Sequence, residues 1–175
     1  MIEFNPKAVF YIAKKEFLDN IRNRWIILLT IIFVILALVV SYAAGVQSGG
    51  EELFGAIEDT ILVLTSISIL LIPIIAIVLG YSTIVGEAEK GSLQLILSYP
   101  VRRFELILGK FFGLGSVLFT TILLGFGLSG IIIMIFVGTD QWLKYLISIF
   151  MTLLLALIYL SVMICVSSLV KRKVA

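Results

Sequence analysis

The chain has 175 residues, of which 61% are hydrophobic and only 14% are charged, and its net charge at pH 7 is +2. A soluble domain carries roughly 25% charged residues and could not bury so much apolar surface, so the composition excludes a soluble globular fold. We therefore predict an all-α membrane protein that forms a single transmembrane domain over residues 1–175.

The first segment, residues 5–23, is predicted to form a helix at the membrane interface. Phe10, Ala13, Phe17 and Ile21 recur at helical spacing on one face, and basic residues occupy the other faces. Pro6 suits the first turn of such a helix. The alternative is an ordinary basic flank that only sets the orientation of the chain.

Four apolar runs follow, and each has the roughly 20 residues that a spanning helix needs. Pro73 is expected to kink the second span. The central stretches of the spans carry no ionisable residue, which disfavours an ion-coupled carrier. The predicted spans are Trp25–Gly45, Ile61–Gly86, Ile107–Val137 and Leu143–Val170.

The positions of lysine and arginine predict the orientation. Twelve of the thirteen basic residues fall on one side of the predicted spans, outside them or near their ends, and Lys144 is the exception. The positive-inside rule makes that side cytoplasmic, so both termini are expected in the cytoplasm.

Residues 87–103 form a charged connection between the second and third spans. Gly91 permits a change of direction, Ser92 can cap a short helix over Leu93–Ser98, and Pro100 ends it. The apolar side chains in this connection would be covered by a partner surface or by the lipid interface. A connection that is only solvated would not need apolar side chains. We therefore predict a docking loop, and the alternative is a solvated connection that supplies positive charge.

Motifs within the spans indicate helix packing rather than chemistry. Residues 125–130 match G-x-G-x-x-G but lie inside an apolar run, without the strand that a nucleotide site needs. The four-residue separations of small residues instead allow close helix approach. Cys165 is single and has no histidine to activate it, so we expect a packing residue. No ATP site, metal site or catalytic residue is expected. The predicted helix-packing residues are Gly109, Gly113, Gly125 and Ser129.

The docking loop resembles a family pattern, E-x-E-x-G-[ST]-L-x-x-[IL]-L-x-x-P-[VIL]-x-R followed by GK at Gly109 and Lys110. This pattern looks like the permease subunits of type-2 ABC exporters, the group that includes the membrane subunit of nitrous-oxide-reductase maturation systems. Ala13–Trp25 is similar to the elbow helix of the same family. By resemblance, the coupling or partner-binding residues are Glu87, Glu89, Gly91, Ser92, Leu93, Leu95, Ile96, Leu97, Pro100, Arg102 and Arg103.

The resemblance implies a permease that pairs with a second permease copy, as a homodimer or heterodimer, in the plasma or inner membrane. A cytosolic ABC ATPase subunit would bind ATP and act on the coupling loop, so the chain itself is expected to be no enzyme and to hold no cofactor. No nucleic-acid partner is expected. Family permeases have six spans, and this chain ends after the fourth, so we expect a fragment.

Two other functions stay open from the sequence. A non-transport membrane anchor or assembly factor could use the same loop to dock a cytosolic partner. A small four-span carrier is disfavoured by the lack of an intramembrane charge.

Overall fold

The computed structural model describes residues 6–47, 53–89, 103–136 and 142–170. Within these ranges the chain forms helices and no strand, as predicted. The helices are α1 (Pro6–Ile21), α2 (Arg24–Gln47), α3 (Leu53–Glu89), α5 (Arg103–Phe136) and α6 (Trp142–Val170).

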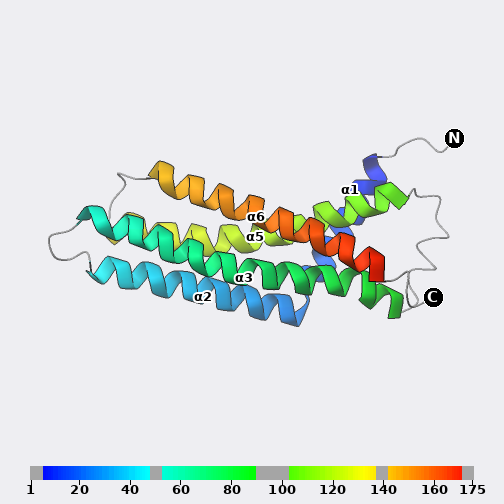
Figure 1. The fold of residues 1–175 in the computed structure, drawn as a ribbon, viewed down its shortest axis with the longest axis horizontal. Coiled ribbons are helices and arrows are strands. Elements are labelled where there is room, and N and C mark those ends of the chain that lie inside the picture. The colour runs from blue at the N-terminus through cyan, green and yellow to red at the C-terminus, as the bar shows by residue number, and fades with distance from the viewer. Residues whose placement is uncertain (1–5, 48–52, 90–102, 137–141, 171–175) are drawn as a thin grey trace.

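Four of the helices lie side by side along the length of the molecule, and α1 crosses one end of them (Figure 1). The helix α5 packs against α1, α2 and α6, while α3 packs against α2 and α6. All four long helices are long and apolar enough to cross a membrane, which confirms the four predicted spans. Their candidate spans are Arg24–Ala43, Thr60–Tyr81, Phe104–Ile135 and Trp142–Ser167.

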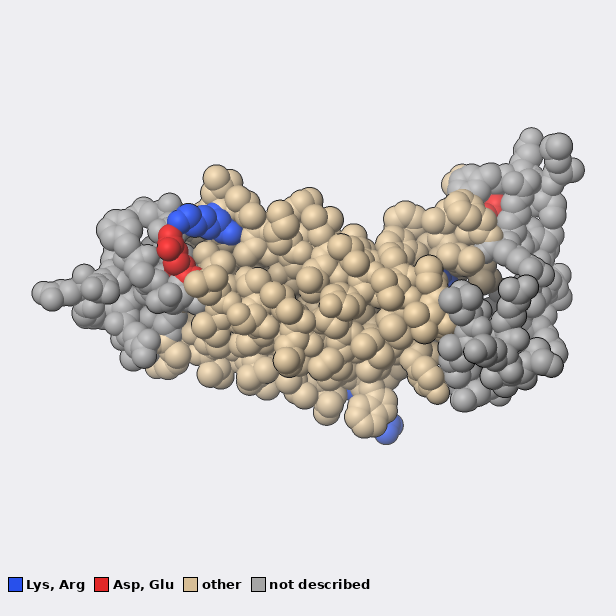
Figure 2. Space-filling model, viewed as in Figure 1, with Lys and Arg blue, Asp and Glu red and all other residues tan. Residues whose placement is uncertain are grey.

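The apolar side chains divide into an inner set and an outer set. Ile75 of α3, Leu118 of α5 and Leu160 of α6 are among the side chains fully enclosed between the helices. Many others, such as Leu70 and Ile135, project outward and are more than half exposed. On the face in Figure 2, charged side chains gather toward the ends of the helices and the stretch between them is uncharged. Such an apolar exterior is what a bilayer solvates.

Two helices are longer than the predicted spans. The helix α3 begins at Leu53 rather than Ile61, continues through Pro73 and ends at Glu89 rather than Gly86. The helix α5 begins at Arg103 rather than Ile107. A hydropathy boundary falls where charged residues begin, but glutamate and arginine are good helix formers, so the helix does not stop there.

Hydroxyl groups connect α2 to α5 within the bundle. Thr30 Oγ1 and Thr121 Oγ1 are 3.1 Å apart, and Ser41 Oγ hydrogen-bonds Ser129 Oγ further along both helices. Ser129 also lies 3.4 Å from the main-chain oxygen of Ala37. These bonds join α2 and α5 at two depths in the bundle. They also give the hydroxyl groups hydrogen-bond partners, which the lipid hydrocarbon could not provide.

An exposed ion pair joins α3 to α6 at the end of the bundle opposite α1. Lys144 Nζ of α6 donates a hydrogen bond to Glu58 Oε1 of α3. Both side chains are about half exposed, so solvent screens the pair and its contribution to stability is small.

Candidate functional site

The end of the bundle that carries α1 is the candidate functional site, because the predicted docking loop attaches there. The helix α3 ends and α5 begins at this end, and α1 lies against the first turns of α5 (Figure 1). Glu87 and Glu89 form part of the last turns of α3, and Arg103 is the first residue of α5. These three residues therefore belong to helix ends rather than to a loop.

The remaining docking residues lie outside the described residues. They include the short helix expected over Leu93–Ser98, and their partner-binding role stays a prediction. The residues concerned are Gly91, Ser92, Leu93, Leu95, Ile96, Leu97, Pro100 and Arg102.

A buried ion pair joins α1 to the first turns of α5. Lys110 Nζ of α5 donates a hydrogen bond to Glu16 Oε1 of α1 at 2.9 Å, and the two side chains are only 6% and 7% exposed. Asn20 Nδ2 donates to the main-chain oxygen of Glu16 at 2.8 Å and to Glu16 Oε2 at 3.4 Å. A charge buried away from water is tolerated when it is paired and hydrogen-bonded, and Glu16 meets both conditions.

Two glycines of α5 allow α1 to approach closely enough for this pair to form. A Cβ atom added at Gly109 would stand 2.6 Å from Ile12 Cγ2, and one added at Gly113 would stand 2.7 Å from the main-chain oxygen of Ala13. Real Cβ atoms do not approach other atoms so closely. The two predicted packing glycines thus lie one turn apart on the face that α1 covers.

The corner between α1 and α2 is short and hydrogen-bonded. The amide of Asn23 donates to the main-chain oxygen of Asn20 at 3.0 Å, which closes the end of α1. Asn23 Oδ1 accepts from the amide of Trp25 at 3.0 Å, the bond of an N-cap, and the main-chain oxygen of Asn23 accepts from Ile27. The position of α1 is therefore set from both sides, by α2 and by α5.

The other two predicted packing residues contact α2 in the middle of the bundle. Gly125 faces the ring of Phe33, whose atoms a Cβ at that position would overlap, and Ser129 makes the hydroxyl bond described above. The ring of Phe33 in turn packs on Phe126, with centroids 6.2 Å apart. Close approach here joins α2 to α5, and not α1 to α5.

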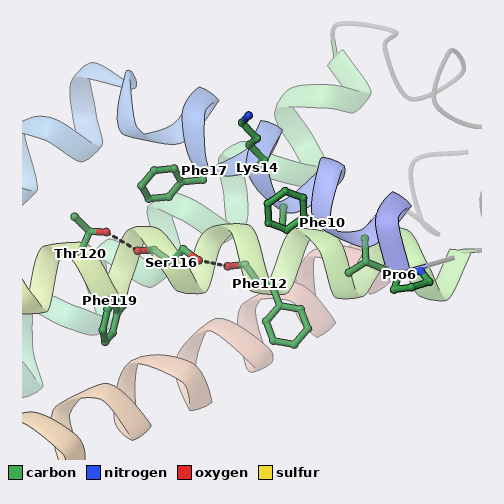
Figure 3. Close-up of a pocket in the computed structure, with 10 residues that line it drawn as sticks. Pro6, Phe10, Lys14, Phe17, Phe112, Ser116, Phe119 and Thr120 are labelled. Atoms are coloured by element: carbon green, nitrogen blue, oxygen red, sulfur yellow. Dashed lines mark hydrogen bonds between the residues drawn. The ribbon is translucent and has the colours of Figure 1, made fainter.

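An apolar groove of about 710 Å³ runs between the exposed faces of α1 and α5, and we call it the α1–α5 groove (Figure 3). It is open at the surface, and the predicted interfacial face of α1 forms one wall. The lining residues are Pro6, Val9, Phe10, Ala13, Lys14, Phe17, Phe112, Ser116, Phe119 and Thr120.

Sequence reasoning missed the pairing of Glu16 with Lys110. The helical periodicity of α1 predicts the apolar face, most of which lines the groove, whereas the charge pattern predicts Lys110 only as a cytoplasmic basic residue. One signal was available: Lys110 follows Gly109 at the start of a long run without another charge, where a lone charge needs a partner. Nothing in the local pattern indicates that the partner is Glu16.

The four apolar helices, with α1 packed across one end of them, define a multi-pass membrane protein. Comparison with known families identifies the family of membrane proteins to which it belongs. Residues 10–175 match the family described as ABC-2 family transporter protein, so the chain belongs to that family. This match confirms the family resemblance found in the docking loop and extends it over nearly the whole chain.

Two relatives give a finer comparison. The chain is 40% identical over 129 residues to the "Probable ABC transporter permease protein NosY" of Stutzerimonas stutzeri, which covers 74% of this chain and 46% of the relative. It is 39% identical over 127 residues to the protein of the same description from Pseudomonas aeruginosa, covering 73% of this chain and 46% of the relative. The chain therefore spans about half the length of these relatives.

Proposed function

We propose that this chain is the membrane-spanning permease part of an ATP-driven ABC transporter that exports its substrate. The observation that carries the proposal is the family match over residues 10–175, together with relatives described as ABC transporter permeases. The four apolar helices support it, because a permease must provide the path across the bilayer.

The energy for transport is proposed to come from a separate cytosolic ATPase. The sequence contains no phosphate-binding loop, since Gly109-Lys110 is followed by Phe111 instead of a hydroxyl residue. ATP would therefore be bound by the partner, and this chain would be no enzyme by itself. The ATPase would act on the connection between α3 and α5, residues 87–103.

The contacts of α5 support a role for that connection in coupling. Arg103 begins α5, and seven residues later Lys110 makes the buried pair with Glu16. A displacement of the connection would therefore move the first two turns of α5 and α1 together. A second permease copy would pair with this one, as a homodimer or heterodimer, in the plasma or inner membrane.

The connection can be tested by changing Leu95 and Ile96 together to alanine. If each side chain is buried in the ATPase, its loss costs about 1.5–3 kcal/mol, so docking of the partner should weaken by about 100-fold or more. Co-purification of the ATPase and ATP-driven transport are the measurements. Leu70→Ala with Ile69→Ala, on the exposed face of α3, is the matched control and should leave docking unchanged.

Two results would contradict the proposal. Wild-type docking and transport in the Leu95→Ala, Ile96→Ala variant would reduce the segment to a connector. Reproducible ATP binding by the isolated chain, free of contaminating ATPase, would contradict the separate energy source.

A further inference from the structure

The α1–α5 groove has an apolar body and one cation at its edge. Lys14 is the single charged side chain among the lining residues. In Figure 3 it lies between Phe10 and Phe17, with its amine directed away from α5. Within the described part of the chain, Lys14 has no ion pair or hydrogen bond, whereas its neighbour Lys15 lies 4.0 Å from Asp19.

The hydroxyl groups in the wall do not offer polar contacts to an occupant. Ser116 Oγ donates to the main-chain oxygen of Phe112 at 2.7 Å, and Thr120 Oγ1 donates to that of Ser116 at 2.8 Å. Both bonds return to α5 itself, so the wall that an occupant meets is apolar along its length. The occupant must therefore combine an apolar body with an anionic end.

A second, smaller groove lies directly beside the first. It has a volume of about 210 Å³, runs between α5 and α6, and ends on Leu153, Ala156 and Leu157. Phe112, Ser116 and Phe119 line both grooves and form the ridge that separates them. Two neighbouring apolar channels that share one ridge match a molecule with two hydrocarbon chains.

The geometry points to a bound anionic diacyl phospholipid, with one acyl chain in the α1–α5 groove, the other in the groove beside α6, and the phosphate next to Lys14. A lysine near the membrane surface attracts an anionic headgroup, and each buried methylene adds to the affinity. The inference depends on the chain being a membrane protein and not on the proposed transport function.

A second copy of the chain fits the groove less well. It would have to present a carboxylate to Lys14. The carboxylates described at this end of the bundle are either buried or close to a lysine of their own chain. Glu16 and Glu105 are buried, and Asp19 faces Lys15. An apolar helix face from another copy would leave the Lys14 amine facing a hydrocarbon surface, which is costly for a charge.

The test uses the purified protein in detergent, titrated with phosphatidylglycerol or phosphatidylcholine and examined by native mass spectrometry. We expect one phosphatidylglycerol to be retained in preference to phosphatidylcholine. Lys14→Gln should reduce that preference about fivefold, the effect of one lysine at a membrane surface. Lys15→Gln removes the same charge one residue away, outside the groove, and should leave the preference unchanged.

A second variant tests the hydrocarbon part of the site. Ser116→Phe places a ring on the shared ridge and should abolish retention of both lipids. Ser161→Phe is its matched control, because Ser161 of α6 is exposed, bonds its own helix at 2.8 Å in the same way and lines neither groove.

Three outcomes would overturn the inference. They are equal retention of the two lipids, equal effects of Lys14→Gln and Lys15→Gln, and unchanged retention in Ser116→Phe. A dimer in the same spectra that Ser116→Phe abolishes, with lipid retention unaffected, would assign the groove to a second copy instead.

Discussion

Glu16 and Lys110 are 94 positions apart in the chain, yet they form a buried ion pair in which Lys110 Nζ lies 2.9 Å from Glu16 Oε1. The pair lies within the interface where Ile12 and Ala13 of α1 approach Gly109 and Gly113 of α5, so it helps to hold α1 against α5. Its energetic role can be measured directly.

Removing one partner should destabilise the protein strongly. Lys110→Met removes the Lys110 ammonium from the buried Glu16 carboxylate, and breaking a buried pair in this way costs about 3–5 kcal/mol. The double change Glu16→Leu with Lys110→Met should recover most of the loss, because neither charge then remains. The measurement is the temperature at which the solubilised protein loses its monodisperse elution peak. Lys15→Gln, in an exposed pair, is the control, and a Lys110→Met variant as stable as Lys15→Gln would disprove the role of the pair.

The glycines of α5 should differ sharply in their tolerance of alanine. A Cβ at Gly113 would stand 2.6 Å from Glu16 Cβ and 2.7 Å from the Ala13 main-chain oxygen, so Gly113→Ala should cost about 1–3 kcal/mol. Gly127 has no atom within 4 Å of such a Cβ, so Gly127→Ala should be neutral or stabilise the helix by up to about 1 kcal/mol. Thermal stability of the two variants gives the comparison, and equal loss in both would argue against close packing at Gly113.

Tyr145 should contribute through its hydroxyl as well as its ring. Tyr145 Oη donates to the main-chain oxygen of Phe126 at 2.5 Å, and the ring lies 5.9 Å from that of Phe126. Tyr145→Phe keeps the ring and removes the bond, so a loss of about 1 kcal/mol is expected. Tyr159→Phe removes a hydroxyl from an exposed position on the same helix and should have no effect. Indistinguishable melting of both variants and the parent would show that the bond does not matter.

Orientation in the membrane can be read from two exposed lysines at opposite ends of the bundle. With Cys165 replaced by alanine, a cysteine is introduced in place of Lys15 or Lys144. If both termini are cytoplasmic, a membrane-impermeant thiol reagent added to intact cells should label position 144 and spare position 15. Labelling of position 15 alone would reverse the topology.

The sequence was sufficient to predict the helical class and the four spans, because apolar runs of spanning length have few other solutions. The ends of the helices were harder to predict from the sequence. The first turn of α5 begins at Arg103 and includes Glu105, which is buried, whereas hydropathy alone places the start of the span at Ile107.

The candidate site could be predicted only in part. The aromatic face of α1 was found from its periodicity, and the glycine positions from their spacing. The residues that face Gly109 and Gly113, and the partner of Lys110, depend on which helix packs on α5. That choice is made by contacts distant in the chain, which a periodic pattern along one helix does not contain.

The anchoring of α1 has a consequence for how the protein is made. Translation proceeds from the N-terminus, so Glu16 has been synthesised long before Lys110 enters the membrane with the third span. The helix that will cover Gly109 and Gly113 is already present, held next to α2 by the Asn23 corner. A nascent chain shortened to begin at α2 would insert Lys110 with neither its counter-ion nor its cover. We therefore expect the first helix to supply the contacts that Lys110 and the two glycines need when the third span inserts.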